Sequence, residues 1–206
     1  MNAEVSEDVT GEVTLEKLAG IILAAGASRR MGSPKALLDY RGETFVDRLI
    51  RVFSRSCDPV IVVAGVHADL IRGRMDRRAR LVINSDPDRG QLSSLQTALA
   101  EVPHDAVGFL FIPVDCPTVR EETIETLIDA VRKDGTLFAI PRYGGRRGHP
   151  VCARNSLIAE FLGLPPTAET RTVVNLHADR ITYVDVDDPG VLADVDDLET
   201  YRELGP

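Results

Sequence analysis

A stretch of small and cationic residues near the start of the chain has the composition of a phosphate-binding loop. It begins as the apolar run 21–25 and then breaks into small and basic residues as far as Lys35. Small residues let the backbone approach a ligand closely, and backbone N–H groups in such a loop can point at an anion. Arg30 and Lys35 would add fixed positive charge. The alternative is a glycine-rich turn whose basic side chains are merely solvated.

A single acidic residue has the position of a metal ligand. Asp115 follows the apolar run 107–112, which predicts a buried central strand. Open α/β sheets bind ligands at the carboxyl ends of their strands, and Mg²⁺ prefers carboxylate oxygens together with phosphate and water. The sequence therefore predicts that Asp115 holds a metal ion at this edge of the sheet.

A group of polar residues precedes the helix predicted to begin near residue 95. Asn84 ends a short apolar strand, and Gly90, Ser93 and Ser94 follow it. Both serines sit where the helix is expected to begin, so N-capping is one interpretation. The other is ligand binding, because N–H groups and hydroxyls at a helix start can hold a base, a ribose or a phosphate.

The spelling of the first loop resembles a known family signature. It reads L-A-A-G-x-S-x-R-M-G-x-x-K and contains neither GxGxxG nor GxxxxGK[ST]. It resembles the signature of the MobA-like NTP transferases, nucleotidyltransferases that share a fold with the sugar-nucleotide pyrophosphorylases. The resemblance covers about residues 18–204. It implies nucleotide binding by the following residues: Leu23, Ala24, Ala25, Gly26, Asn84, Gly90 and Ser93.

Two further motifs imply the metal ligands of this family. The D-x-P at Asp115 resembles the magnesium aspartate, although many relatives carry Gln or Met where this chain has Cys116. That difference leaves the metal role intact, and Cys116 is expected to be only a small buried residue. The spelling D-V-D-D-L-E-T-Y resembles D-I-D-T-P-E-D-Y and implies Asp194 as the second metal ligand. Asp196 and Asp197 are expected to occupy the start of the last helix.

The string R-x-G-H-P-V resembles the acceptor-side element of the family. It implies that His149 binds an anionic group of the acceptor, and the alternative is a structural histidine hydrogen-bonded to a loop carbonyl. Either Arg146 or Arg147 would face an acceptor phosphate, and Arg147 is taken as the candidate. The surrounding segment 137–153 is expected to cover the acceptor side.

Together these residues imply nucleotidyl transfer. Asp115 and Asp194 would hold Mg²⁺, while Arg30 and Lys35 would stabilise the charge on departing pyrophosphate. The attacking group would be a phosphate oxygen of the acceptor, which is already anionic, so alignment and electrostatics suffice without a strong general base.

The substrates follow less directly from the motifs. L-A-A-G resembles the cytidylyltransferase branch, whereas the guanylyl-transferring branch usually reads L-A-G-G. The preferred hypothesis is therefore transfer of CMP from CTP to a molybdopterin-type cofactor, with a molybdoenzyme as an expected partner. One alternative is a nucleotidyltransferase acting on a sugar phosphate or another small phosphate. The other is a non-catalytic binding or delivery protein of the same fold.

Composition narrows the class of protein. The chain has 206 residues and a net charge of -8, which argues against a nucleic-acid surface. Its three cysteines form no CxxC pair, which favours a reducing cytoplasm. It has no apolar run of about 18 residues that would predict a membrane span.

Buried strand patterns alternating with helical ones predict a three-layer, Rossmann-like α/β nucleotidyltransferase fold with a mostly parallel sheet. Residues 1–17, acidic and polar, are expected to form a flexible tail. Residues 18–206 are expected to form a single domain. Within it, the apolar run 60–64 predicts a buried strand, Thr44 is expected to cap a helix over residues 45–53, and Thr118 is expected to cap the helix that follows Asp115. The sequence does not predict the order of the strands.

Overall fold

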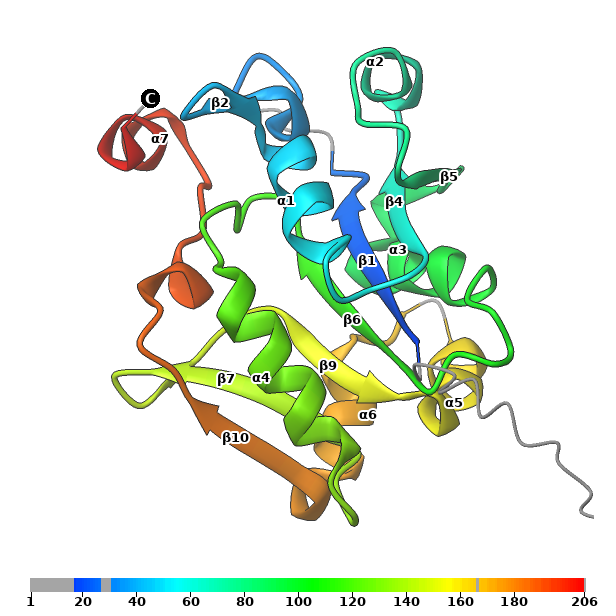
Figure 1. Cartoon of the computed structure of the whole chain (residues 1–206). Helices are drawn as coiled ribbons and strands as arrows, with labels where there is room; N and C mark the ends of the chain where they lie inside the picture. The colour runs from blue at the N-terminus through cyan, green and yellow to red at the C-terminus, as the bar shows by residue number, and fades with distance from the viewer. Residues whose placement is uncertain (1–16, 27–30, 166, 206) are drawn as a thin grey trace, which may run out of the picture.

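One large β-sheet, covered by helices on both faces, forms the centre of the molecule (Figure 1). The computed structural model describes residues 17–26, 31–165 and 167–205. The predicted tail therefore lies outside the described residues, except for Lys17. Strands and helices alternate along the chain, which confirms the predicted three-layer α/β class.

The large sheet is mostly parallel, as predicted. Its order is β10-β7-β9-β6-β1-β4-β5, with β8 paired to β7, while β2 and β3 form a separate ribbon. Only β8 and β9 run antiparallel to their neighbours in the large sheet. The strands are β1 (Leu18–Ala24), β2 (Asp39–Tyr40), β3 (Glu43–Thr44), β4 (Val60–Ala64), β5 (Arg80–Ile83), β6 (Gly108–Pro113), β7 (Phe138–Tyr143), β8 (Arg146–Arg147), β9 (Val151–Arg154) and β10 (Ile181–Asp185).

The α-helices are short, and all except α7, which follows the last strand, lie between strands in chain order. None of the described helices is both long enough and apolar enough to cross a membrane. The α-helices are α1 (Phe45–Phe53), α2 (Ala68–Arg72), α3 (Gln91–Leu99), α4 (Glu121–Arg132), α5 (Ile158–Gly163), α6 (Arg171–Leu176) and α7 (Leu198–Leu204). The 3-10 helices are η1 (Lys35–Leu37), η2 (Pro87–Arg89), η3 (Asn155–Leu157), η4 (Ala178–Arg180) and η5 (Pro189–Leu192).

The first strand is apolar throughout because both of its faces are covered. Ile22 and Ala24 belong to the core cluster that includes α1 and α4. Ile21 and Leu23 belong to the cluster that includes α3, α5 and α6. Successive side chains of a strand point to opposite faces, so a central strand buried on both sides needs apolar residues at every position.

The helix predicted over residues 45–53 is observed with those bounds as α1. Thr44 is its N-cap, and the Thr44 hydroxyl accepts a hydrogen bond from the backbone N–H of Asp47 at 3.2 Å. This bond satisfies one of the backbone donors that a helix start leaves without an intrahelical partner. The predicted capping role of Thr44 is confirmed.

The helix after Asn84 begins earlier than predicted, which overturns the capping interpretation of Ser93 and Ser94. α3 begins at Gln91, and Gly90 is the N-cap with φ of 92°. Glycine adopts this positive φ at little cost because it has no Cβ. Ser93 is therefore in the first helical turn, where its hydroxyl donates back to the Gly90 carbonyl at 2.8 Å.

A buried carboxylate joins the start of α4 to the segment that follows β10. Asp188 is 2% exposed and accepts hydrogen bonds from the Arg120 backbone N–H at 2.9 Å and from the Thr123 hydroxyl at 2.7 Å. It also accepts from the Gly190 N–H at 2.9 Å. The sequence predicted a local cap from Thr118, but the carboxylate that satisfies the helix start comes from 68 residues further along the chain.

We expect Asp188→Ala to lower the free energy of unfolding by about 3 kcal/mol, because three donors in a buried site lose their acceptor. Urea unfolding followed by circular dichroism measures this loss. Asp187→Ala is the matched control, since Asp187 is exposed and its side chain makes no described hydrogen bond. Equal stability of the two variants would contradict this assignment.

Candidate active site

The carboxyl ends of β1, β4 and β6 meet at one edge of the sheet, and the first loop leaves β1 there. Ala24 and Ala25 are buried, and Gly26 is exposed. The backbone at Gly65, just after β4, is so close that a Cβ on it would lie 2.6 Å from the Ala25 carbonyl oxygen. The start of the loop is therefore held firmly at the sheet edge. Arg30, a predicted catalytic residue, lies outside the described residues.

Lys35 reaches from η1 into a group of carboxylates. Its Nζ lies 2.8 Å from Asp115 Oδ2 and 2.9 Å from Asp196 Oδ1, and its side chain is 14% exposed. Burial opposes the positive charge, but the hydrogen bonds to the two carboxylates outweigh it, so the pKa of Lys35 is raised. Lys35 is therefore a fixed cation at the carboxyl end of β6.

The two predicted metal ligands, 79 positions apart in sequence, lie in one cluster. The structure places oxygens of Asp115 and Asp194 and the sulfur of Cys116 all within 4.8 Å of one another. The Val195 backbone N–H donates to the Asp115 carbonyl oxygen at 2.9 Å, which ties the two segments together. Burial, followed by the nearby charges of Asp115 and Asp196, raises the pKa of Asp194. A cation bound here would relieve that repulsion.

Asp196 is a residue of this site that the sequence analysis missed. Both Asp196 and Asp197 are predicted from the sequence at the start of α7, but only Asp197 caps it. Its carboxylate accepts from the backbone N–H groups of Glu199 at 3.1 Å and Thr200 at 2.9 Å. Val195 is 2% exposed. An acidic, apolar, acidic alternation places both outer side chains on the same side of an extended chain, and this pattern could have identified Asp196.

The predicted nucleotide-binding residues after β5 are also close together. Asn84 Nδ2 donates to Ser93 Oγ at 2.9 Å and to Ser94 Oγ at 3.0 Å. Asn84 Oδ1 accepts from the Asp86 N–H at 3.0 Å. Asn84 and Ser93 are buried and Gly90 is exposed. The side chains of Asn84 and Ser93 therefore shape the turn that presents the backbone at Gly90, and their contacts with a nucleotide stay a prediction.

His149, a predicted acceptor-binding residue, lies half-buried in the segment before β9. Burial lowers the pKa of His149, and the charge of Asp115 opposes that effect. Its backbone N–H donates to the Val191 carbonyl at 2.8 Å, whereas its Nδ1 is buried and has no hydrogen-bond partner. The alternative of a structural histidine bonded to a loop carbonyl through its ring therefore lacks that bond at Nδ1.

The other predicted acceptor residue is further out on the hairpin. Arg147 is exposed on β8, and its guanidinium carbon lies 4.7 Å from the centre of the Tyr183 ring. No contact between Arg147 and Lys35 or Asp115 is present in the described part of the chain. Its acceptor role stays a prediction.

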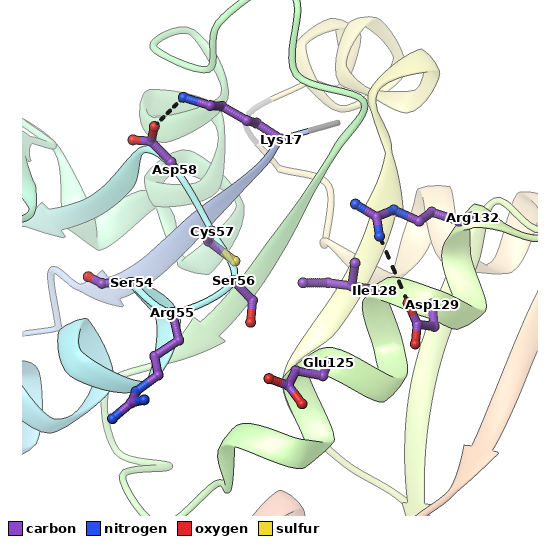
Figure 2. Close-up of a pocket in the computed structure, with 10 residues that line it drawn as sticks. All are labelled: Lys17, Ser54, Arg55, Ser56, Cys57, Asp58, Glu125, Ile128, Asp129 and Arg132. Atoms are coloured by element: carbon purple, nitrogen blue, oxygen red, sulfur yellow. Dashed lines mark hydrogen bonds and ion pairs between the residues drawn. The ribbon is translucent and has the colours of Figure 1, made fainter. Parts of the chain in front are cut away.

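A pocket at the other end of the strands, near the amino end of β1, does not belong to this site (Figure 2). It has a volume of about 340 Å³ and lies between the end of α1 and one face of α4. Its charges are internally compensated, since Lys17 Nζ lies 2.7 Å from Asp58 and Arg132 lies 3.9 Å from Asp129. Lys17 precedes β1, so the pocket is at the amino end of the strand whose carboxyl end carries the first loop.

Comparison with known proteins identifies relatives of this arrangement. The family described as MobA-like NTP transferase domain matches residues 20–181. The crystal structure of Rv0371c from Mycobacterium tuberculosis H37Rv superposes with a TM-score of 0.77 at 31% identity, over 93% of this chain and 98% of that chain. Rv0371c in complex with manganese superposes with a TM-score of 0.72 at 29% identity, over 91% and 97%.

A relative from Bacillus cereus (strain AH820) is named probable molybdenum cofactor guanylyltransferase. It is 25% identical over 185 residues, which cover 87% of this chain and 90% of the relative. The family match spans most of the chain and includes the loop after β1, Asp115 and the β7–β8 hairpin. The chain therefore belongs to the MobA-like NTP transferase family and is a nucleotidyltransferase.

Proposed function

We propose that the protein transfers a nucleoside monophosphate, CMP from CTP, to the phosphate of a molybdopterin-type cofactor and releases pyrophosphate. The observation that carries this proposal is the meeting of the Lys35 ammonium with the carboxylates of Asp115 and Asp194 beside the loop that leaves β1. An anionic triphosphate and a divalent cation both have complementary charges at this edge.

The donor set fits a divalent cation such as Mg²⁺. Asp115 and Asp194 offer two carboxylates that lie close to each other. Burial and the neighbouring carboxylates disfavour the charged form of Asp194 and raise its pKa, and a bound cation would stabilise that charged form. The manganese complex of Rv0371c supports a divalent metal in a related protein. When bound, Mg²⁺ would neutralise charge on the phosphates of the nucleotide.

Lys35 would bind and stabilise the leaving group. In the structure its ammonium rests on two carboxylates, and a triphosphate oxygen can replace one of them as partner. Arg30 would share this role. Charge on the departing pyrophosphate is greatest in the transition state, so a cation held in place beforehand stabilises that state most.

The chain's own residues need not supply a nucleophile. The acceptor's phosphate oxygen, already anionic, would attack the α-phosphorus. Among the described side chains, no histidine is hydrogen-bonded to a serine or a cysteine, which is the arrangement expected of an activated nucleophile. His149, half-buried and near enough to be influenced by the charge of Asp115, would orient the acceptor, and Arg147 would bind its more exposed anionic part.

We assign the choice between the nucleotide bases to the L-A-A-G segment, residues 23–26. Ala25 is 4% exposed and lies in the same core cluster as Leu92, in the first turn of α3 next to Gly90. A methyl group at this position, on the face of the sheet that α3 covers, would reduce the space for a base and so favour the smaller pyrimidine over a purine. The names of the Bacillus relatives favour guanylyl transfer instead, so GTP is the alternative donor.

We expect Ala25→Gly to raise the ratio of kcat/KM for GTP to that for CTP by about tenfold, because the lost methyl enlarges the space next to Gly90. Steady-state pyrophosphate release with each nucleotide measures the ratio. Ala24→Gly is the matched control, since Ala24 belongs to the cluster on the other face of the sheet. A ratio that changes equally in both variants would remove Ala25 from base selection.

The direct test is pyrophosphate release with Mg²⁺, with CTP, GTP, ATP and UTP each offered together with molybdopterin cofactor or a panel of sugar 1-phosphates. Release with CTP and molybdopterin cofactor is the expected result. Release with a sugar phosphate alone would overturn the acceptor. Nucleotide binding without release from any pair would favour delivery of the cofactor to a molybdoenzyme partner.

The proposed location is the cytoplasm, where the cofactor and nucleotides would be available. Cys57, Cys116 and Cys152 are free and buried, which suits a reducing compartment.

A further inference from the structure

Cys116 has no visible role in the core that would require a thiol, yet its sulfur points into the acidic cluster. It is 3% exposed, and no described donor or acceptor is hydrogen-bonded to its Sγ. That Sγ lies within 4.8 Å of ligand oxygens of both Asp115 and Asp194. The sequence by itself predicts only a small buried residue at this position. The burial is confirmed, but the direction of the thiol is an additional finding.

Two carboxylates and one sulfur make a different donor set from two carboxylates alone. Mg²⁺ takes oxygen ligands in a near-octahedral arrangement and gains nothing from sulfur. Zn²⁺ and Cd²⁺ accept thiolate and carboxylate together, and Zn²⁺ commonly takes three protein ligands with water in the fourth position. The sulfur of Cys116 therefore adds a ligand that a thiophilic divalent cation can use, beside the two carboxylates that also suit Mg²⁺.

We propose that Asp115, Asp194 and Cys116 together form a binding site for a thiophilic divalent cation of the Zn²⁺ or Cd²⁺ type. One cation would bind per chain, with one oxygen from each carboxylate and the sulfur of Cys116 as ligands. This inference shares its two carboxylates with the metal site of the proposed function.

Binding at this site includes the loss of one proton from the thiol. An unperturbed cysteine thiol, with a pKa of about 8.5, holds its proton near neutral pH. On binding, the S–H bond breaks, the sulfur–metal bond forms, and the proton passes to solvent. A cation also competes with the Lys35 ammonium for Asp115, since Nζ lies 2.8 Å from Oδ2.

Titration of the full chain with Cd²⁺ alone tests the site, without nucleotide or acceptor. The readout is the ultraviolet charge-transfer absorption of a cadmium–thiolate bond, together with calorimetric affinity and stoichiometry. We expect one Cd²⁺ per chain with this absorption. Cys116→Ser should remove the absorption and weaken binding by at least about 10- to 100-fold, because changes around a metal ligand already have effects of that size.

Cys57→Ser is the matched control. Cys57 is also buried, but it lies beside the pocket at the other end of the strands, so this variant should keep the absorption and the affinity. Asp194→Asn should weaken binding and retain the thiolate absorption, which tests the site independently if Cys116→Ser fails to fold.

The outcomes separate this inference from the proposed function. The inference would be overturned if the wild-type protein lacked the absorption at saturating Cd²⁺, or if Cys116→Ser kept it. Either result would count even if Mg²⁺-dependent turnover were normal. A protein that shows Cys116-dependent absorption but releases no pyrophosphate with any substrate pair would retain the metal site and lose the proposed reaction.

Discussion

Replacing Asp115 with alanine is expected to lower metal-dependent pyrophosphate release by at least about 1000-fold while the fold survives. The Asp115 carboxylate is one of the two ligands proposed for Mg²⁺ and follows the central strand β6. Its loss would leave the cation without its partner at the position where the triphosphate must align. Turnover of the variant, measured over a range of Mg²⁺ concentrations, gives the size of the effect.

The fold should tolerate this change because the structural bond of Asp115 is made by its backbone. The Val195 N–H donates to the Asp115 carbonyl oxygen, which alanine retains. The carboxylate itself is 21% exposed and contacts Lys35, which keeps Asp196 as a second partner. Thermal unfolding of the variant should therefore be close to that of the wild-type protein.

Asp129→Ala is the control for the Asp115 variant. Asp129 is a carboxylate that lines the pocket at the other end of the strands (Figure 2). The Asp129→Ala variant should have the same turnover as the wild-type protein. If Asp115→Ala retained wild-type turnover with the same Mg²⁺ requirement, the proposed metal site would be wrong.

Replacing Lys35 with alanine is expected to weaken triphosphate binding and to lower kcat by about 100- to 1000-fold. The ammonium is held by two carboxylates at 2.8 and 2.9 Å, so its position is set before the substrate binds. A cation positioned beforehand needs little reorganisation when charge develops on pyrophosphate. Nucleotide affinity by calorimetry and single-turnover rates separate the binding effect from the chemical one.

Lys17→Ala is the matched control for Lys35→Ala. Lys17 also forms an ion pair, with Asp58 at 2.7 Å, but its side chain is 58% exposed and lies at the amino end of β1. Exposed pairs of this kind contribute little to stability, and this one is far from the proposed reaction. Unchanged affinity and rate in Lys35→Ala would remove the first loop's lysine from the mechanism.

Local patterns in the sequence were sufficient for several elements of the fold. The apolar run 60–64 is observed as β4 with those bounds, and the helix after Thr44 has its predicted bounds as α1. Both depend on information held within a few residues: burial on both faces for the strand, and a cap followed by helical spacing for the helix. The family motifs singled out Asp115 and Asp194, which the structure places close together, and their role as metal ligands stays a prediction.

The tertiary structure decided which side chains meet across the chain. Lys35 and Asp196 are 161 positions apart, and their contact follows from the order of the strands and the path of the segment after η5. Asp188 satisfies the start of α4 from 68 positions away, in place of the local cap that the sequence suggested.

Sequence alone therefore determined the strand and helix patterns, the family motifs and the charge of the first loop. Only the structure showed which carboxylates pair with Lys35 and that α3 begins earlier than predicted. It also showed the direction of the Cys116 thiol. The physical reason is that helical and strand periodicity records which face of an element is buried, whereas a contact between distant segments depends on how the whole sheet is assembled.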